Sequence, residues 1–161
     1  MKNLRKNFFG QYNAAFTLIE ILLVISLVAL LAGIVIFAVN PAKQLADGRN
    51  AQRKTDVNTI LNAIYQYALD NNGSFPASLS TNESCASIDS NSICKSSASS
   101  CTNLTDLSVL TTAEKYLISI PNDPSNNGDN YTGYYAHRNN NGRVEVCAPA
   151  AEQGATISVA R

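Results

Sequence analysis

The chain is poor in the residues that catalytic and metal sites use most. Its 161 residues include one histidine, no tryptophan and four cysteines, none of which forms a Cys-x-x-Cys pair. No Gly-x-Ser-x-Gly motif and no glycine-rich phosphate loop occurs. Nucleophilic, zinc and nucleotide sites depend on such residues at close spacing. We therefore expect no catalytic site and no enzyme activity.

The chain also lacks an excess of charge of either sign. Its 12 Lys and Arg balance its 12 Asp and Glu, so it has no positive field of the kind that gathers nucleic acid. The aromatic and basic residues of one predicted strand are the candidates for base stacking: Tyr134, Tyr135, His137 and Arg138. A solvent-exposed strand face, or a packing role for the histidine, is the stronger interpretation. DNA is thus an unsupported alternative partner.

The four cysteines favour disulfide bonds over a metal site. Cys85, Cys94, Cys101 and Cys147 all lie in the polar sequence after a long apolar run. An even number of cysteines in a small polar domain is typical of an oxidising compartment, and His137 is not spaced to complete a zinc site. Three pairings are open. The preferred one joins Cys85 to Cys94, which closes a short loop, and Cys101 to Cys147, which ties the loop region to the sheet.

An apolar run of 22 residues, from Leu18 to Val39, stands near the start of the chain. As a helix it would measure roughly 33 Å, enough for a hydrocarbon core of about 30 Å. It exceeds the apolar core of an ordinary secretory signal, which holds about 7 to 15 residues. We therefore predict a membrane-spanning helix, with a conventional signal peptide as the alternative.

Basic residues flank the run on both sides, so the positive-inside rule is close to a tie. Three precede the run and four follow it: Lys2, Arg5 and Lys6, then Lys43, Arg49, Arg53 and Lys54. The cysteines break the tie, because disulfides form in exported domains. We expect the C-terminal part to be exported.

One carboxylate interrupts the apolar run. Glu20 lies about one turn into it, and no Lys, Arg or His occurs within the run. A charged group at the bilayer centre costs roughly 2.5 to 3.5 kcal/mol on insertion scales, so such residues usually have a functional partner. The alternative is that Glu20 sits among lipid head groups and stabilises the positive N-terminus of the helix.

The segment Ala15-Phe16-Thr17-Leu18-Ile19-Glu20 and the apolar residues after it resemble the processing motif of type IV prepilins and type II secretion pseudopilins. The resemblance implies that a prepilin peptidase cuts before Phe16 and methylates its new α-amino group. It also implies that Glu20 is the assembly residue, pairing with the terminal amine of a neighbouring subunit. Ala15 departs from the Gly that the family prefers before the cut.

This resemblance implies a structural subunit of a type IV pilus-like filament, polymerised through its N-terminal helix. Its partners would be copies of itself, other pilins, the prepilin peptidase and an inner-membrane assembly platform. Before assembly it would be a single-pass inner-membrane protein surrounded by lipid, and afterwards part of a surface or periplasmic filament. A pseudopilin of type II secretion is one alternative. A membrane-anchored exported binding module is the alternative from another class.

The predicted fold class is α+β, with a long N-terminal helix whose second half packs on a small antiparallel sheet. We expect a leader at 1–15, a transmembrane and assembly helix at 16–40, the exported half of the helix at 41–72, and a loop-rich head at 73–161. Apolar residues at steps of three or four predict the packed face of the helix: Val57, Ile60, Leu61, Ile64, Ala68 and Leu69.

Local signals divide the rest of the chain. Asn40-Pro41 marks either a kink in one helix or the start of a second helix, and Asn72-Gly73 marks a helix end. The Ser- and Asn-rich stretch at 77–105 is predicted to be a loop held by disulfides rather than by packing. A short helical stretch is expected at 111–117. Strands are expected at 131–138, 143–148 and 156–160, the first two joined by an Asn-rich turn.

One loop offers oxygen ligands of the kind that calcium prefers. Its members are Asp123, Asn126, Asn127 and Asp129. Major pseudopilins carry a calcium site in a similar region, so the resemblance makes calcium a secondary hypothesis. Because the spacing does not match an EF-hand, no cofactor is expected.

Overall fold

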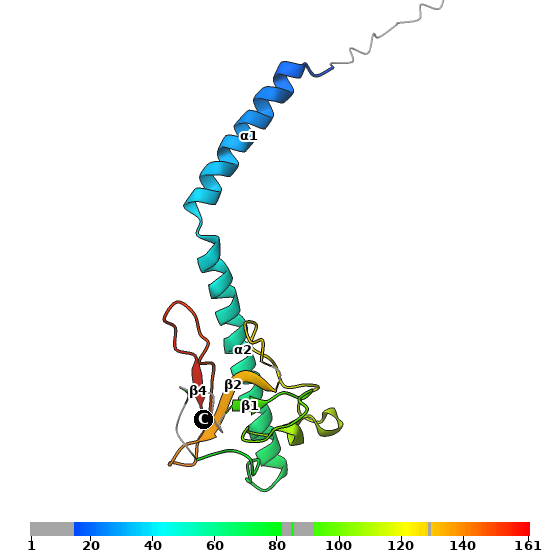
Figure 1. Cartoon of the computed structure of the whole chain (residues 1–161), viewed down its shortest axis with the longest axis vertical. Helices are drawn as coiled ribbons and strands as arrows, with labels where there is room; N and C mark the ends of the chain where they lie inside the picture. The colour runs from blue at the N-terminus through cyan, green and yellow to red at the C-terminus, as the bar shows by residue number, and fades with distance from the viewer. Residues whose placement is uncertain (1–14, 82–84, 86–91, 129) are drawn as a thin grey trace, which may run out of the picture. The chain divides into compact units, whose positions relative to one another are not determined.

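The structure is a computed structural model that describes residues 15–81, 85, 92–128 and 130–161. It divides into two compact units, Met1–Pro41 and Ala42–Arg161. Among the described residues, the first unit contains the helix α1, which we call the stem, and the second contains the strands and is called the head. Figure 1 shows the helices α1 and α2 and labels the strands β1, β2 and β4.

The stem helix α1 spans Leu18–Ala38. Thr17 caps its start, because the side-chain oxygen accepts a hydrogen bond from the Glu20 N–H at 3.3 Å. The helix ends where Val39 turns to extended backbone, just before Asn40-Pro41; a residue that precedes proline disfavours the α conformation. In the described part of the chain, α1 is the one helix long and apolar enough to cross a membrane.

A separate helix, α2, spans Pro41–Asp70, so the second interpretation of Asn40-Pro41 is the correct one. Proline suits this position, since its fixed φ favours the first helical turn. The helix ends as predicted: Gly73, at φ +82°, donates its N–H to the Ala68 carbonyl oxygen at 2.8 Å. Glycine adopts this left-handed backbone without strain.

The predicted packed face of α2 is confirmed except at its end. Five of its six members are buried: Val57, Ile60, Leu61, Ile64 and Ala68. Leu69 was wrongly included, because its side chain is 81% exposed. Each residue turns a helix by about 100°, which carries Leu69 off the face that holds Ala68.

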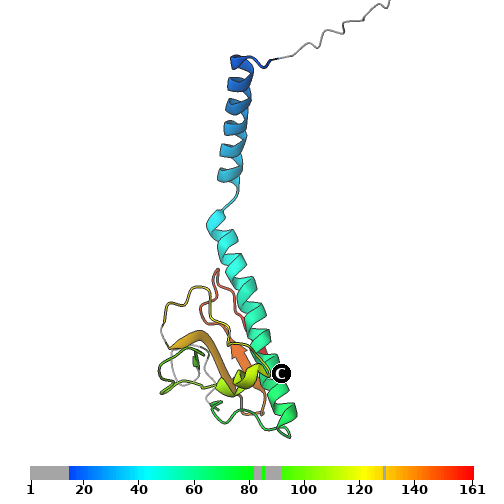
Figure 2. The ribbon, with the colours of Figure 1, turned by 90° about the vertical axis from the view of Figure 1, so that its right-hand side faces the viewer.

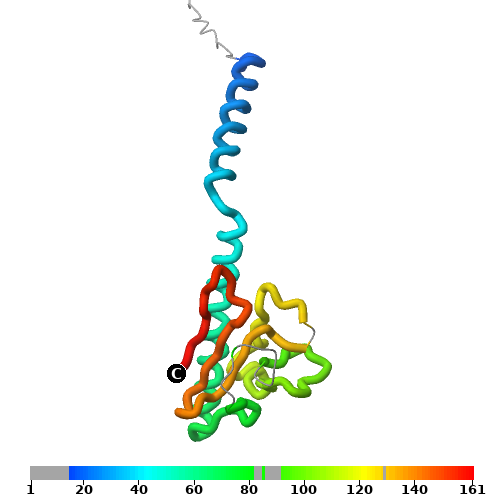
Figure 3. Tube along the Cα trace, turned by 60° about the vertical axis from the view of Figure 1, so that its left-hand side comes forward, coloured from blue at the N-terminus to red at the C-terminus, as the bar shows by residue number. Residues whose placement is uncertain are grey.

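In the described part of the head, four antiparallel strands form one sheet in the order β1-β2-β3-β4. Their bounds are Ser92–Cys94, Tyr131–Arg138, Val144–Cys147 and Ser158–Ala160. Figure 3 lets the eye follow β2, β3 and β4, from orange to red. Between β2 and β3, Gly142 turns at φ +81° and donates its N–H to the Asn139 carbonyl oxygen. The predicted hairpin is therefore present.

The sheet packs on α2, and this interface forms the core of the head (Figure 2). Ile60, Leu61 and Ile64 of α2 meet Tyr134 and Ala136 of β2 in one fully buried cluster. Alternate residues of a strand point to one face, so Tyr134 and Ala136 face the helix together. The α+β prediction is confirmed.

Two local predictions were wrong. The stretch at 77–105 contains β1, whose three residues are all buried, with Ile93 in the core. Its backbone pairs with β2 on one side and with Thr105 on the other, so packing as well as disulfides holds it. The expected helical stretch at 111–117 contains only a short 3-10 turn, Thr112–Glu114, and another such turn, Ser108–Leu110, precedes it. Ala113 interrupts it with a φ of +53°.

Candidate functional site

The start of the stem holds the residues that the sequence motif singled out. Ala15 and Phe16 precede the helix and are exposed, Phe16 by 76%. The bond between them therefore lies outside the regular structure, two residues before the first helical residue Leu18. The leader residues 1–14 lie outside the described part of the chain.

Glu20 lies in the first turn of α1 and is its one charged side chain. No ion pair among the described residues includes Glu20. The next basic residue along the chain is Lys43, 23 positions later (43 − 20 = 23) and beyond the end of α1. A carboxylate so placed depends on water, on lipid head groups or on a cation from another molecule.

The four cysteines form two disulfides, but not in the preferred pairing. Cys85 bonds to Cys147 and Cys94 bonds to Cys101. The pairing of Cys85 with Cys94 and of Cys101 with Cys147 was wrong because it ignored β1. The stretch from Lys95 to Thr105 folds back so that Thr105 pairs with Ser92, and this return brings Cys101 to 5.5 Å from Cys94, measured between Cα atoms.

A buried arginine joins three segments of the head. Arg53 of α2 donates from Nε to Asp123 Oδ2 at 2.6 Å and from Nη2 to Asp123 Oδ1 at 3.1 Å. Its remaining donors reach Asn50, Ser125 and Glu152. The side chains of Arg53 and Asp123 are both 0% exposed. A buried charge is tolerated when every donor and acceptor finds a partner, and this pair meets that condition.

Glu152 completes the cluster from the loop between β3 and β4. It accepts from Arg49 at 2.6 and 2.5 Å and from Arg53 at 3.0 Å. Asn50 holds the backbone of the same loop, donating to the Glu152 carbonyl oxygen and accepting from its N–H. We call Arg49, Asn50, Arg53, Asp123 and Glu152 the head clamp.

The arginines stabilise the ionised form of both clamp carboxylates. Hydrogen bonds from Arg49 and then from Arg53 lower the pKa of Glu152 to about 2. Burial works against ionisation of Asp123, but hydrogen bonds from Arg53 and Ser125 outweigh it and lower its pKa. The hydrogen bond to Asp123 in turn raises the pKa of Arg53. The clamp is therefore charged at neutral pH.

A glycine allows the loop of Asp123 to approach the sheet. Gly133 of β2 has a φ of +86°, and a Cβ added there would lie 2.8 Å from the Cβ of Asp123. Asp123 also donates its backbone N–H to the Thr132 carbonyl oxygen at 2.8 Å. Any larger residue at Gly133 would push the loop away from Arg53.

The candidate calcium loop does not fit a calcium ion in the described residues. The Asp123 carboxylate already faces a guanidinium, and Asn126 donates to the Tyr131 carbonyl oxygen and accepts from the Gly128 N–H. Asp129 lies outside the described residues. Elsewhere in the described ranges, no three His, Cys, Asp or Glu side chains converge.

The proposed base-stacking face is not at the surface. Tyr134, Tyr135 and His137 are at most 3% exposed. The Tyr134 hydroxyl donates to Asp56 Oδ2 at 2.6 Å, and burial raises its pKa. Arg138 is exposed but lies over the ring of Phe75. A solvent-exposed strand face was the wrong expectation, because both faces of β2 are covered; the packing role of the histidine is the correct one.

Comparison with known families finds one match, to a sequence motif near the start of the chain. The prokaryotic N-terminal methylation motif matches residues 11–36, which include the Ala15–Phe16 bond, Glu20 and most of α1. No curated protein and no solved structure matches the chain significantly. The motif is the signature of type IV pilins and pseudopilins, and in this chain it covers most of the stem.

Sequence reasoning missed the head clamp. From the sequence, Arg49 and Arg53 were interpreted only as positive charges that follow the apolar run and bear on its orientation in the membrane. A signal was present, because Arg53 lies four residues before Val57 and so extends the packed face of α2 by one turn. A charged residue on a buried helical face calls for a partner of opposite charge.

Proposed function

We propose that this protein is a structural subunit of a type IV pilus-like filament. The observation that carries the proposal is Glu20, the one charge in a 21-residue apolar helix that the methylation motif overlaps. A helix that served only as an anchor would need length and hydrophobicity but no carboxylate at this place. A pseudopilus of type II secretion is the alternative that the same stem would serve.

In this proposal a prepilin peptidase removes residues 1–15 and methylates the α-amino group of Phe16. Residues 16–40 then form the transmembrane and assembly segment, which contains α1. Residues 41–72 form the exported segment, which contains the separate helix α2, and 73–161 form the loop-rich rest of the head. Before assembly the precursor lies in the inner membrane with its C-terminus exported. An assembly platform there transfers it from lipid to a growing filament of like subunits.

Cleavage supplies the cation that Glu20 lacks. The new amine of Phe16 lies four residues, or about 6 Å of helix, before Glu20. On a neighbouring subunit shifted axially by that length, the amine comes to the depth of Glu20 and can reach its carboxylate. Packed stems exclude water, which strengthens the attraction and makes either charge costly alone. Removing one partner of a buried pair destabilises by roughly 3–5 kcal/mol, and a filament repeats that loss at every subunit.

Replacement of Glu20 tests the proposal in cells that carry the assembly machinery. Glu20→Gln should give processed protein in the membrane but few or no sheared filaments, because the carboxylate is needed for assembly and not for insertion. Glu20→Asp keeps the charge and should retain part of the filament yield. Normal filaments from Glu20→Gln, in a strain where this subunit is abundant in the wild-type filament, would refute the pairing.

A further inference from the structure

The two disulfides of the head are nested along the chain. The bond between Cys94 and Cys101 lies inside the interval that Cys85 and Cys147 span. In the proposed function the head follows a membrane-bound stem, so its cysteines reach the oxidising compartment in the order of the sequence. Pairing each cysteine with the next would join Cys85 to Cys94 and Cys101 to Cys147. The native bonds therefore differ from those that the order of export favours.

Loop length does not distinguish the native bond of Cys94 from its competitor. Cys94 lies nine positions after Cys85 (94 − 85 = 9) and seven before Cys101. Because the entropy of loop closure changes slowly with length, the two bonds form with probabilities within a factor of about 1.5. In an unfolded segment Cys94 therefore joins either neighbour about equally often.

The contacts that bring Cys101 to Cys94 depend on a strand that is exported later. In the folded head the Cys94 N–H donates to the Thr105 carbonyl oxygen, and the Thr105 N–H donates to the Ser92 carbonyl oxygen. Two hydrogen bonds on a three-residue strand are not stable by themselves. Strand β1 is also paired with β2, which begins 37 positions after Cys94 (131 − 94 = 37). The first three cysteines are thus exported before the sheet that pairs them correctly exists.

A wrong first bond leads to a wrong second bond. The chain has four cysteines, so a bond between Cys85 and Cys94 leaves Cys101 and Cys147 to join each other. Each bond forms when two thiols pass two electrons and two protons to the disulfide of an exported donor protein. We call the product with both wrong bonds the mispaired chain.

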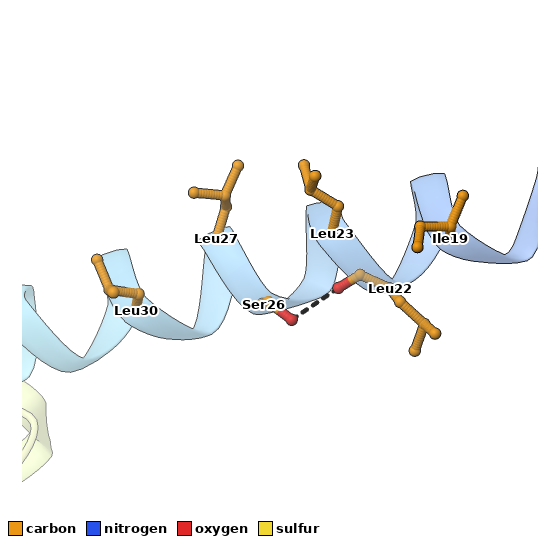
Figure 4. Close-up of a pocket in the computed structure, with 6 residues that line it drawn as sticks. All are labelled: Ile19, Leu22, Leu23, Ser26, Leu27 and Leu30. Atoms are coloured by element: carbon orange, nitrogen blue, oxygen red, sulfur yellow. Dashed lines mark hydrogen bonds between the residues drawn. The ribbon is translucent and has the colours of Figure 1, made fainter.

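The mispaired chain has no group that can reopen its bonds. Exchange begins when a thiolate attacks a disulfide sulfur, and all four thiols are already oxidised. The stem adds none: the side chains drawn in Figure 4 are hydrocarbon except Ser26, whose hydroxyl donates to the Leu22 carbonyl oxygen at 2.7 Å. The attacking thiolate must therefore come from another molecule.

We infer that an exported thiol–disulfide isomerase is a maturation partner of the head and converts the mispaired chain to the native one. The isomerase thiolate attacks Cys94 Sγ, which forms a mixed disulfide and releases Cys85 as a thiolate. The Cys85 thiolate attacks Cys147 Sγ, which forms the first native bond and releases Cys101. The Cys101 thiolate attacks Cys94 Sγ, which forms the second native bond and restores the isomerase thiolate. Two disulfides break and two form, so no electrons are gained or lost.

Disulfide pairing in bacterial hosts with and without an exported disulfide isomerase tests the inference. Free thiols are blocked before lysis, and the disulfides of the full chain from the membrane fraction are mapped without reduction. Cleavage at Asp89 and Lys95 separates the first three cysteines. Deletion of the isomerase should lower the amount of natively paired chain about twofold, since Cys94 joins either neighbour about equally often. Restoring the isomerase should recover it, whereas an isomerase without its active-site cysteines should not.

Two double variants that allow only one bond are matched controls. Cys94→Ser/Cys101→Ser keeps Cys85 and Cys147, and Cys85→Ser/Cys147→Ser keeps Cys94 and Cys101. Neither variant can form a wrong bond within the chain, so deletion of the isomerase should not change the amount of disulfide-bonded protein in either.

The outcomes separate this inference from the proposed function, because it rests on export of the head and not on filament assembly. An unchanged amount of natively paired wild type after the deletion would overturn the inference alone. Equal losses in the wild type and both double variants would also overturn it, because they would reflect a general effect of the deletion. Four free thiols in the wild-type chain would show that the head is not exported, which overturns the proposed function as well.

Discussion

The two long helices of this chain differ in burial and in what stabilises them. None of the 21 residues of α1 is buried, and its surface is almost wholly apolar. The 30-residue helix α2 carries charges along its length and buries one face against its own sheet. Helix α2 is therefore stabilised within the chain, whereas α1 must take its stability from a membrane or from other stems.

Their charges differ in the same way. Arg53 of α2 is fully buried and finds Asp123 and Glu152 in its own head. Glu20 of α1 finds no such partner among the described residues. A charge that the fold satisfies is structural, and one that the fold leaves unsatisfied points to another molecule.

The largest effect is expected from breaking the head clamp. Arg53→Met should destabilise the head by roughly 3–5 kcal/mol, because Asp123 would remain buried without its cation. Arg49→Met should have a smaller effect, since the Arg49 side chain is 37% exposed. The tyrosine band of the near-UV circular dichroism spectrum, followed during urea unfolding of the chain from residue 16 in detergent, reports the head alone, because every tyrosine after Tyr12 lies beyond α1. Equal stabilities for Arg53→Met and the wild type would show that the clamp is not structural.

The two disulfides should differ in their contributions. Cys85–Cys147 spans 62 positions and Cys94–Cys101 spans 7. In the chain-entropy model the first stabilises by about 4 kcal/mol and the second by about 2 kcal/mol. The double variant Cys85→Ser/Cys147→Ser should therefore have the lower Tm. The reverse order of melting would mean that local packing around β1 outweighs loop length.

Acid should lower the unfolding free energy of the head by protonating Glu152. Its pKa lies near 2 in the folded chain against an ordinary value of 4.5, so the folded state holds the proton less tightly than the unfolded state. Stability from this group is then complete above about pH 4.5 and is lost as the pH falls toward about 2. Glu152→Gln should flatten the wild-type fall in unfolding free energy over this window. If the unfolding free energies of the wild type and Glu152→Gln fell in parallel over this pH range, the role of Glu152 would be contradicted.

The parts that sequence predicted well carry strong local patterns. The apolar run placed the stem to within one residue at its C-terminal end, and strand β2 was predicted with its observed bounds, Tyr131–Arg138. Periodicity and turn chemistry act over a few residues and can be read directly. At the stem, Ala15, Phe16 and Glu20 lie within residues 11–36, which the methylation motif matches, and their individual roles stay predictions.

The parts that sequence missed depend on distant partners. Arg53 and Asp123 are 70 residues apart, and Cys85 and Cys147 are 62 apart. Strand β1 has only three residues and is flanked by polar sequence, so its burial comes from pairing with β2 and Thr105 rather than from its own pattern. Such contacts follow from the assembled sheet and have no local signature.

The most direct test of the central claim is the mass of the N-terminal peptide in sheared filaments. The account predicts a peptide that begins at Phe16 and carries one methyl group on its α-amine, because only that terminus supplies a cation beside Glu20. Filaments whose subunits begin at Met1, or after Ala38, would contradict it, since the first keeps the leader and the second lacks the stem.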